Sequence, residues 1–248
     1  MKINENERID DLEYKGLKII QNAKDFCFGI DSVLLSDYAK NIKEKATVVD
    51  IGTGSGVIGL LLCKKTKLNK TYGVEIQKHV AELAKRNIKL NKLETKFEVI
   101  NKDIKDIFTH LEPNKIDVVV TNPPYKKANT GIINHNKTQR VARHEVECTL
   151  EDIIKVSSKL LKHGGEFYMV HRAERLVDIM CLLRENKIEP KNIRFVHTRQ
   201  NEKPNLILIR AVKNAKEFFK IDKPLIIYKE DGKYTDEILR IYDKKEQK

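Results

Sequence analysis

The sequence predicts an α/β fold in which a central, mostly parallel β-sheet carries helices on both faces. Short apolar runs rich in β-branched residues alternate with segments of helical periodicity, and this alternation is typical of repeated strand–helix–strand units. The chain has 248 residues, of which 40% are hydrophobic and 34% charged, so it can bury one substantial core. We therefore expect one domain over residues 1–248, with an N-terminal cap segment (1–45), a core (46–212) and a C-terminal hairpin and helix (213–248).

The order of the apolar runs assigns the individual elements. Seven runs predict strands, at Ala46–Asp50, Thr71–Glu75, Lys96–Ile100, Ile116–Thr121, Glu166–Val170, Asn192–Val196 and Leu206–Val212. Four segments predict the helices between them, at Gly56–Lys65, Gln77–Leu90, Leu150–Leu161 and Glu174–Glu185. In the tail we expect a hairpin around Leu225–Tyr228 and Asp231-Gly232, and a short helix around Asp236–Tyr242. Because proline has no N–H group to donate, we place Pro190 and Pro204 outside the strands.

Composition excludes several classes of protein. No apolar run is long enough to predict a transmembrane helix. The first residues, MKINENERIDD, are acidic and polar, unlike a secretory signal, so we expect a cytoplasmic protein. The cysteines stand singly along the chain and the histidines form no HExxH pattern, so we predict no metal site. These cysteines are Cys27, Cys63, Cys148 and Cys181.

The net charge of the chain is strongly basic. A formal charge of +12 and a pI of about 9.3 are typical of proteins that bind polyanions, because basic side chains neutralise phosphates. The same charge can arise in any protein from an A/T-biased genome, since the chain is rich in Lys, Ile and Asn and lacks Trp. Charge alone therefore leaves a nucleic-acid partner open.

The turn after the first predicted core strand carries the first chemical signal. Asp50, Gly52, Gly54 and Gly56 occupy alternate positions between an apolar strand and an apolar helix. Glycines allow the backbone to approach a ligand closely, and the N-terminus of the next helix offers unpaired N–H groups. In an open parallel sheet this crevice is where ligands bind. Residues Gly54–Gly59 also satisfy GxGxxG, the fingerprint of dinucleotide enzymes, so NAD competes as the cofactor.

Three acids near the ends of successive strands favour S-adenosylmethionine over NAD. Asp50 would repel a pyrophosphate, but it would attract the ammonium and sulfonium groups of S-adenosylmethionine. Glu75, with Ile76 beside it, can accept hydrogen bonds from ribose hydroxyls, as it could for either cofactor. Asp103 can accept the adenine amine, and Ile104 can cover the adenine ring. A helix N-cap is the alternative role for Asp103.

A rigid loop follows the fourth predicted core strand and reads Asn122-Pro123-Pro124-Tyr125. Two prolines fix φ, so the Asn122 side chain and the Pro123 carbonyl can be held as paired acceptors. Paired acceptors suit an exocyclic amine, because accepting both of its hydrogens leaves the nitrogen lone pair free to attack a methyl group at near-attack distance. Tyr125 can stack on a base that is unpaired or flipped out. The alternative is an ordinary proline turn with a core tyrosine.

Together these motifs resemble the class I S-adenosylmethionine-dependent methyltransferases that modify amino nitrogens. The resemblance rests on Val48–Gly56, Glu75, Asp103 and Asn122–Tyr125. It implies a Rossmann-like fold with a seven-stranded sheet whose last strand is antiparallel. The Asn-Pro-Pro-Tyr motif is shared by N6-adenine DNA and RNA methyltransferases and by the glutamine N5-methyltransferases that act on release factors, so it indicates amine chemistry without naming the substrate.

The flanking segments resemble one branch, the bacterial tRNA1(Val) (adenine-37-N6)-methyltransferase family. Phe28–Ser36 is similar to the Gly-x-Asp-x-x-Leu-Leu segment of that family, Arg143-His144-Glu145 to its Arg-Glu-rich stretch, and Tyr234-Thr235 to its closing Tyr-Ser/Thr pair. The resemblance implies methyl transfer to N6 of an unpaired adenine in tRNA, at adenosine 37 of the anticodon loop. It also implies that Asp31 helps to close the methionine end of the S-adenosylmethionine site.

By the same resemblance, the segment 126–148 would border the substrate. Its basic side chains Lys126, Lys127, Arg140 and Arg143 are our candidates for contacts to RNA phosphates. We infer tRNA as the partner, and neither a membrane nor an obligate protein partner.

Other classes of protein fit less of the chain. A release-factor methyltransferase usually carries a separate helical N-terminal domain, whereas about 45 residues precede the first predicted core strand here. A DNA adenine methyltransferase needs a target-recognition domain, for which the residues beyond Val212 are too few. Neither an NAD oxidoreductase nor a binding module without catalysis needs a proline-framed acceptor loop.

Overall fold

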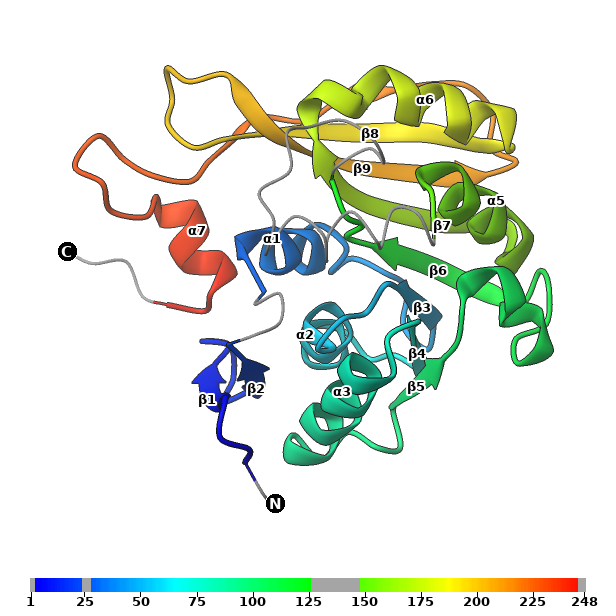
Figure 1. Cartoon of the computed structure of the whole chain (residues 1–248). Helices are drawn as coiled ribbons and strands as arrows, with labels where there is room; N and C mark the ends of the chain where they lie inside the picture. Colours follow the sequence, from blue (N-terminus) through cyan, green and yellow to red (C-terminus); the bar gives the residue numbers. More distant parts are fainter. Residues whose placement is uncertain (1–2, 24–27, 126–147, 245–248) are drawn as a thin grey trace, which may run out of the picture.

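The computed structural model describes residues 3–23, 28–125 and 148–244, and its centre is a nine-stranded β-sheet (Figure 1). In chain order the strands of this sheet are β3 (Thr47–Ile51), β4 (Lys70–Glu75), β5 (Phe97–Asn101), β6 (Ile116–Thr121), β7 (Leu161–Arg172), β8 (Ile188–His197), β9 (Pro204–Lys213), β10 (Lys220–Ile221) and β11 (Leu225–Ile226). They lie in the order β10-β8-β9-β7-β6-β3-β4-β5, and β11 also pairs with β8. None of the helices in the described ranges is long and apolar enough to cross a membrane.

The predicted α/β fold class is confirmed by strands β3 to β9, which correspond to the seven predicted strands. The five neighbouring strands β5, β4, β3, β6 and β7 run parallel. The last of the seven along the chain, β9, runs antiparallel to both β7 and β8. The two extra strands, β10 and β11, extend the edge of the sheet beside β8. The sequence did not predict these two as members of the sheet, because a two-residue strand has no measurable periodicity.

The placement of two prolines outside the strands was wrong. Pro190 lies within β8, and Pro204 is the first residue of β9. The pairing of β8 with β9 shifts its register between Pro190 and Asn192, and again beside Pro204, which pairs with His197. Proline, which has no N–H group to donate, is tolerated at the first residue of a strand and at irregularities of the hydrogen-bond ladder. Pro204 and Pro190 occupy these two kinds of position.

Alternate residues of the central strands face two separate apolar layers. Val48 packs into the layer formed with helices α1 (Ile30–Tyr38), α2 (Val57–Lys65) and α3 (Lys78–Leu90), whereas Val49 faces the layer formed with α5 (Leu150–Leu160) and α6 (Leu176–Glu185) (Figure 1). This alternation follows from the two-residue period of a strand, and it explains why the parallel strands are apolar throughout. The four helices predicted between the strands are confirmed as α2, α3, α5 and α6, whereas α1 was not predicted.

The N-terminal cap segment contains a hairpin that the sequence did not predict. Strands β1 (Glu7–Asp11) and β2 (Lys18–Asn22) pair in antiparallel fashion, and β2 lies against α3. The residues of β1 read ERIDD, which has no apolar alternation, and this explains why the strand was missed. The hairpin is nevertheless attached to the core, because Leu12, Leu17 and Ile19 are buried in the layer that contains α1 to α3.

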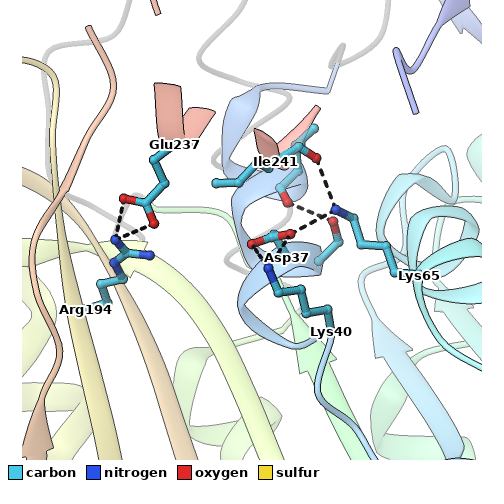
Figure 2. A network of polar contacts seen from close by, with 8 residues as sticks. Asp37, Lys40, Lys65, Arg194, Glu237 and Ile241 are labelled. Carbon is cyan, nitrogen blue, oxygen red and sulfur yellow. Dashed lines mark hydrogen bonds and ion pairs between the residues drawn. The ribbon is translucent and has the colours of Figure 1, made fainter. Parts of the chain in front are cut away.

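The C-terminal helix α7 (Asp236–Ile241) confirms the predicted final helix and packs against α1. Figure 2 shows polar contacts that attach Glu237 and Ile241 of this helix to other parts of the chain. The Lys65 ammonium, whose side chain is 3% exposed, lies 3.1 Å from an Asp37 carboxylate oxygen and donates to the Ile241 carbonyl at 3.2 Å. Arg194 of β8 pairs with Glu237 at 2.8 Å. The predicted hairpin before α7 is reduced to a single antiparallel bridge between Tyr228 and Tyr234.

Candidate active site

The carboxyl ends of the central strands meet at one edge of the sheet. Ile51 at the end of β3 is in register with Val74 of β4 on one side and with Thr121 at the end of β6 on the other. The order of the strands along the chain reverses between β3 and β6, because β4 and β5 continue away from β3 in one direction and β6 and β7 in the other. Ligands of open α/β sheets bind at this kind of switch point.

The glycine turn, residues 52–56, follows β3 and is held largely by its own backbone. The N–H groups of Gly52 and Thr53 both donate to the Val74 carbonyl, at 2.9 and 3.0 Å. Gly52, Gly54 and Gly56 all have positive φ, a backbone conformation that residues other than glycine rarely adopt. A Cβ atom built on Gly52 or Gly54 would meet nothing within 4 Å, so the turn presents bare backbone to an open side where a ligand can approach.

Two of the predicted acids lie directly beneath this turn. Asp50 is fully buried, and its Oδ2 accepts a hydrogen bond from the Thr53 hydroxyl at 2.7 Å. Its Oδ1 is buried without a hydrogen-bond partner among the described residues. Burial raises the pKa of Asp50 to about 7. Glu75 accepts hydrogen bonds from the N–H groups of Gly54 and Gln77, at 3.1 and 3.0 Å, and is therefore oriented by the backbone on both sides.

The other predicted cofactor residues divide between surface and core. Ile76 is 38% exposed beside Glu75, whereas Ile104 is 4% exposed and packs in the core. Asp103 accepts a hydrogen bond from the Lys105 N–H at 2.9 Å at the start of a short 3₁₀ helix, so the N-cap role is present. This geometry leaves the roles of Asp103 and Ile104 toward a ligand as predictions.

The proline loop, residues 122–125, follows β6 and is held by side chains from α1. The Asn122 Nδ2 group donates to the Ser32 hydroxyl at 3.2 Å, and the Tyr125 hydroxyl lies 2.5 Å from an Asp31 carboxylate oxygen and 2.9 Å from Asn122 Oδ1. Burial and the neighbouring Asp31 charge raise the pKa of Tyr125, so its hydroxyl stays protonated. Asp31, which the resemblance placed at the cofactor, here contacts the tyrosine of the proline loop.

Two residues at the end of β7 complete the surroundings of the Tyr125 ring, and the sequence analysis missed both. His171 packs against this ring edge-on, with 5.3 Å between ring centroids, and the Arg172 guanidinium lies 5.1 Å from the ring centroid. Burial lowers the pKa of His171 to about 4, with nearby arginine charges adding to the shift, so the imidazole is neutral at physiological pH. Their position after an apolar strand, at the same sheet edge as the proline loop, was the available signal.

The four basic residues proposed for RNA contact cannot be placed. Lys126, Lys127, Arg140 and Arg143 lie outside the described residues, so their role stays a prediction.

The chain is a Rossmann-like α/β protein in which an open glycine turn and a proline loop lie at the same switch point. More narrowly, the chain belongs to the methyltransferase small domain family, whose family model matches residues 30–186, more than half of its length. The matched region begins with α1 and includes both the glycine turn and the proline loop.

Curated relatives share one name. The tRNA1(Val) (adenine(37)-N6)-methyltransferase of Porphyromonas gingivalis is 27% identical over 241 residues, which are 94% of this chain and 93% of the relative. The protein of the same name from Proteus mirabilis is 28% identical over 84% of this chain and 82% of the relative.

Solved structures share the fold at lower identity. A predicted O-methyltransferase from Agrobacterium tumefaciens superposes with a TM-score of 0.70 at 19% identity, covering 86% of this chain and 95% of that one. M. jannaschii TYW2, solved in complex with AdoMet, superposes with a TM-score of 0.58 at 17% identity, covering 86% of this chain and 88% of that one. These structures support the fold alone.

Proposed function

We propose that this protein transfers a methyl group from S-adenosylmethionine to N6 of an unpaired adenine in tRNA, at adenosine 37 of the anticodon loop. The observation that carries the proposal is the proline loop, which stands at the same sheet edge as the glycine turn with Asn122 and Tyr125 joined by a hydrogen bond. The names of the curated relatives support the choice of tRNA adenine.

The glycine turn and the acids around it fit S-adenosylmethionine. Gly52 and Gly54 leave room for a ligand against the backbone, and Glu75 lies at the end of the next strand for the ribose hydroxyls. Asp50 has a buried carboxylate oxygen without a partner in the described part of the chain, which suits a cationic ligand bound above it. We assign Gly56, Ile76, Asp103 and Ile104 to the same site on the strength of the sequence pattern.

The proline loop would hold the amine that accepts the methyl group. S-adenosylmethionine supplies an electrophilic methyl on a sulfonium, so the protein needs to orient the acceptor more than to remove its proton first. Asn122 Oδ1 and the Pro123 carbonyl are the proposed acceptors for the two amine hydrogens, and Pro124 keeps the loop rigid. The Tyr125 ring would stack on the adenine, and its hydroxyl is already fixed by Asp31 and Asn122.

The basic segment after the proline loop would contact the RNA backbone. Lys126, Lys127, Arg140 and Arg143 remain our candidates, and replacing them should weaken tRNA binding and reduce its dependence on salt. The division into a cap segment (1–45), a catalytic core (46–212) and a C-terminal appendage (213–248) belongs to the same proposal, as does action in the cytoplasm.

A methylation assay with purified components tests the function. Wild-type protein, labelled S-adenosylmethionine and unmodified tRNA should yield N6-methyladenosine on nucleoside mass spectrometry, and the Asn122→Ala variant should not. A release factor offered in parallel tests the glutamine alternative. If label enters the release factor but not the tRNA, the glutamine alternative replaces our proposal. If label enters neither, both substrates are contradicted.

A further inference from the structure

A buried amide on α3 contacts both the N-terminal hairpin and the glycine turn. Asn87 is fully buried, and its Oδ1 accepts a hydrogen bond from the Ile20 N–H of β2 at 2.6 Å. Its Nδ2 group donates to the Ile20 carbonyl at 3.1 Å and to the Ser55 carbonyl at 2.9 Å. All three bonds depend on one orientation of the amide, since the reverse orientation would set an oxygen against two carbonyls.

A second asparagine, one helical turn later, makes two equivalent bonds to β2 but none to the glycine turn. Asn91 accepts from the Lys18 N–H at 3.0 Å and donates to the Lys18 carbonyl at 2.7 Å, so both amides pair with β2 as a neighbouring strand would. The remaining hydrogen of Asn91 goes to the carbonyl of Asn87 within the same helix. Docking of the hairpin and one bond to the end of the same helix therefore account for the side-chain bonds of Asn91. Neither accounts for the bond from Asn87 to Ser55.

The Ser55 carbonyl belongs to the last peptide of the glycine turn. Gly56 follows with a φ of 91°, and its N–H donates back to the Thr53 carbonyl at 2.9 Å to close the turn before α2 begins. Glycines allow such a peptide several orientations, so the amide of Asn87 removes a freedom that the sequence of the turn leaves open. The contact joins residues 32 positions apart and acts directly on the backbone of the glycine turn.

We propose that Asn87 is a positioning residue for the cofactor: it holds the glycine turn in its binding conformation and couples that conformation to the docked N-terminal hairpin. The proposal rests on the proposed function, because the ligand of the turn is taken to be S-adenosylmethionine. Asn87 does not touch the reacting atoms. Its effect is to reduce the ordering that the turn undergoes when the ligand binds.

Paired variants separate this role from simple docking of the hairpin. Asn87→Ala removes the contact to Ser55 together with the two contacts to β2. Asn91→Ala removes two contacts to β2 and one bond to the end of α3, but no contact to the glycine turn. We expect the dissociation constant for S-adenosylmethionine, measured by calorimetry without RNA, to rise about tenfold in Asn87→Ala and less than about twofold in Asn91→Ala, because one lost positioning bond corresponds to about one factor of ten.

Hydrogen exchange of the ligand-free protein supplies the structural readout. Amides of residues 52–60 should exchange faster in Asn87→Ala than in Asn91→Ala, while those of β2 should accelerate in both variants. In steady-state assays the KM for S-adenosylmethionine should rise in Asn87→Ala, with kcat and the KM for tRNA nearly unchanged.

The possible failures are distinguishable. If the wild-type protein binds no S-adenosylmethionine, the proposed function fails and the identity of the ligand with it. If the wild-type binds but the two alanine variants lose affinity equally, the positioning role is contradicted, and Asn87 serves only to dock the hairpin. Asn87→Ser, which removes less volume, is the second variant. If neither Asn87 variant folds while Asn91→Ala does, the residue is required for the fold and our proposal is overturned.

Discussion

The glycine turn and the proline loop lie at the same edge of the sheet, but they are held in different ways. Mainly backbone N–H groups hold the glycine turn against the end of β4, where Gly52 and Thr53 donate to the Val74 carbonyl. The Asn87 amide adds one side-chain bond, to the Ser55 carbonyl. Side chains of α1 hold the proline loop, where Ser32 and Asp31 contact Asn122 and Tyr125. Backbone bonds persist when most side chains change, whereas side-chain bonds can be removed one at a time.

This difference implies that ligand binding and methyl transfer can be broken separately. Changes in the glycine turn should act on the affinity for S-adenosylmethionine, and changes in the proline loop should act on turnover. Four substitutions test this distinction, beginning with the one that should lower turnover most. Ligand affinity and turnover that fell together would contradict it.

Asn122→Ala should have the largest effect. The substitution removes one acceptor for the amine and one partner of the Tyr125 hydroxyl, so we expect kcat to fall by about 10²–10³-fold, as for the loss of one preorganised polar group in other active sites. The dissociation constant for S-adenosylmethionine should change less than about threefold. A rapid-quench assay with tRNA and a calorimetric titration measure the two quantities. Equal losses of turnover and affinity would show that the proline loop and the glycine turn do not act separately.

Gly54→Ala should affect binding with little effect on the rate once the ligand is bound. Its φ of 56° makes alanine unfavourable by about 1 kcal/mol, and the added methyl group would extend into the open side of the turn. We expect the dissociation constant for S-adenosylmethionine to rise at least about tenfold. Gly16→Ala is the matched control, because Gly16 has a φ of 72° and equally open surroundings outside the site. It should cost similar stability, measured by urea unfolding, and leave affinity unchanged.

Asp50→Asn should trade affinity for stability in alkaline solution. Burial raises the pKa of Asp50 to about 7. Between about pH 4 and 7 the folded protein therefore keeps a proton on Asp50 that the unfolded chain has already released. The free energy of unfolding falls as the pH rises through that window. At pH 8 the variant should therefore be more stable than wild type by about 2 kcal/mol, with S-adenosylmethionine affinity reduced about fivefold.

The control for this prediction is an aspartate whose pKa is shifted in the opposite direction. Hydrogen bonds from the Thr47 N–H and from Lys43 and Lys162 overcome the effect of burial and lower the pKa of Asp117. Asp117→Asn should accordingly lose stability at pH 8. Chemical denaturation at pH 5 and pH 8 measures the change in the free energy of unfolding for both variants. A loss of stability in Asp50→Asn at pH 8 would contradict the raised pKa of Asp50.

Tyr125→Phe should have the smallest effect. The ring that is proposed to stack on adenine remains, while the hydroxyl bonds to Asp31 and Asn122 disappear, so we expect kcat to fall about three- to tenfold, corresponding to about 1 kcal/mol. Tyr125→Ala, which also removes the ring, should lower activity considerably further. Similar activities for the two variants in the tRNA methylation assay would show that stacking contributes nothing.

The parts of the fold that could be predicted are those whose periodicity is local. The strands β3 to β9 follow from apolar runs, and the observed β6 has the predicted bounds Ile116–Thr121. The polar strand Glu7–Asp11 and the two-residue strands β10 and β11 carry no such pattern, because they form by pairing with a partner that is distant in sequence or already in place. The positions of Pro190 and Pro204 within strands could not be predicted for the same reason, since only the register of the neighbouring strand shows which N–H groups are needed.

The site divides in the same manner. The glycine turn and the proline loop are contiguous motifs, so their positions at the ends of β3 and β6 could be expected from the sequence. The contacts of Asp31 with Tyr125 and of Asn87 with Ser55 join residues 94 and 32 positions apart, and spacing cannot predict them. A polar Asn87 between the apolar Ala84 and Ile88 of the predicted helix was a signal that the buried face of this helix has a second role.

Nucleoside mass spectrometry of tRNA from cells that lack this protein tests whether tRNA adenine is the substrate. We predict that N6-methyladenosine disappears from position 37 of at least one tRNA, that the wild-type gene restores it, and that a gene encoding Asn122→Ala does not. An unchanged N6-methyladenosine content in every tRNA of the deletion strain would contradict the assignment of tRNA adenine as the substrate.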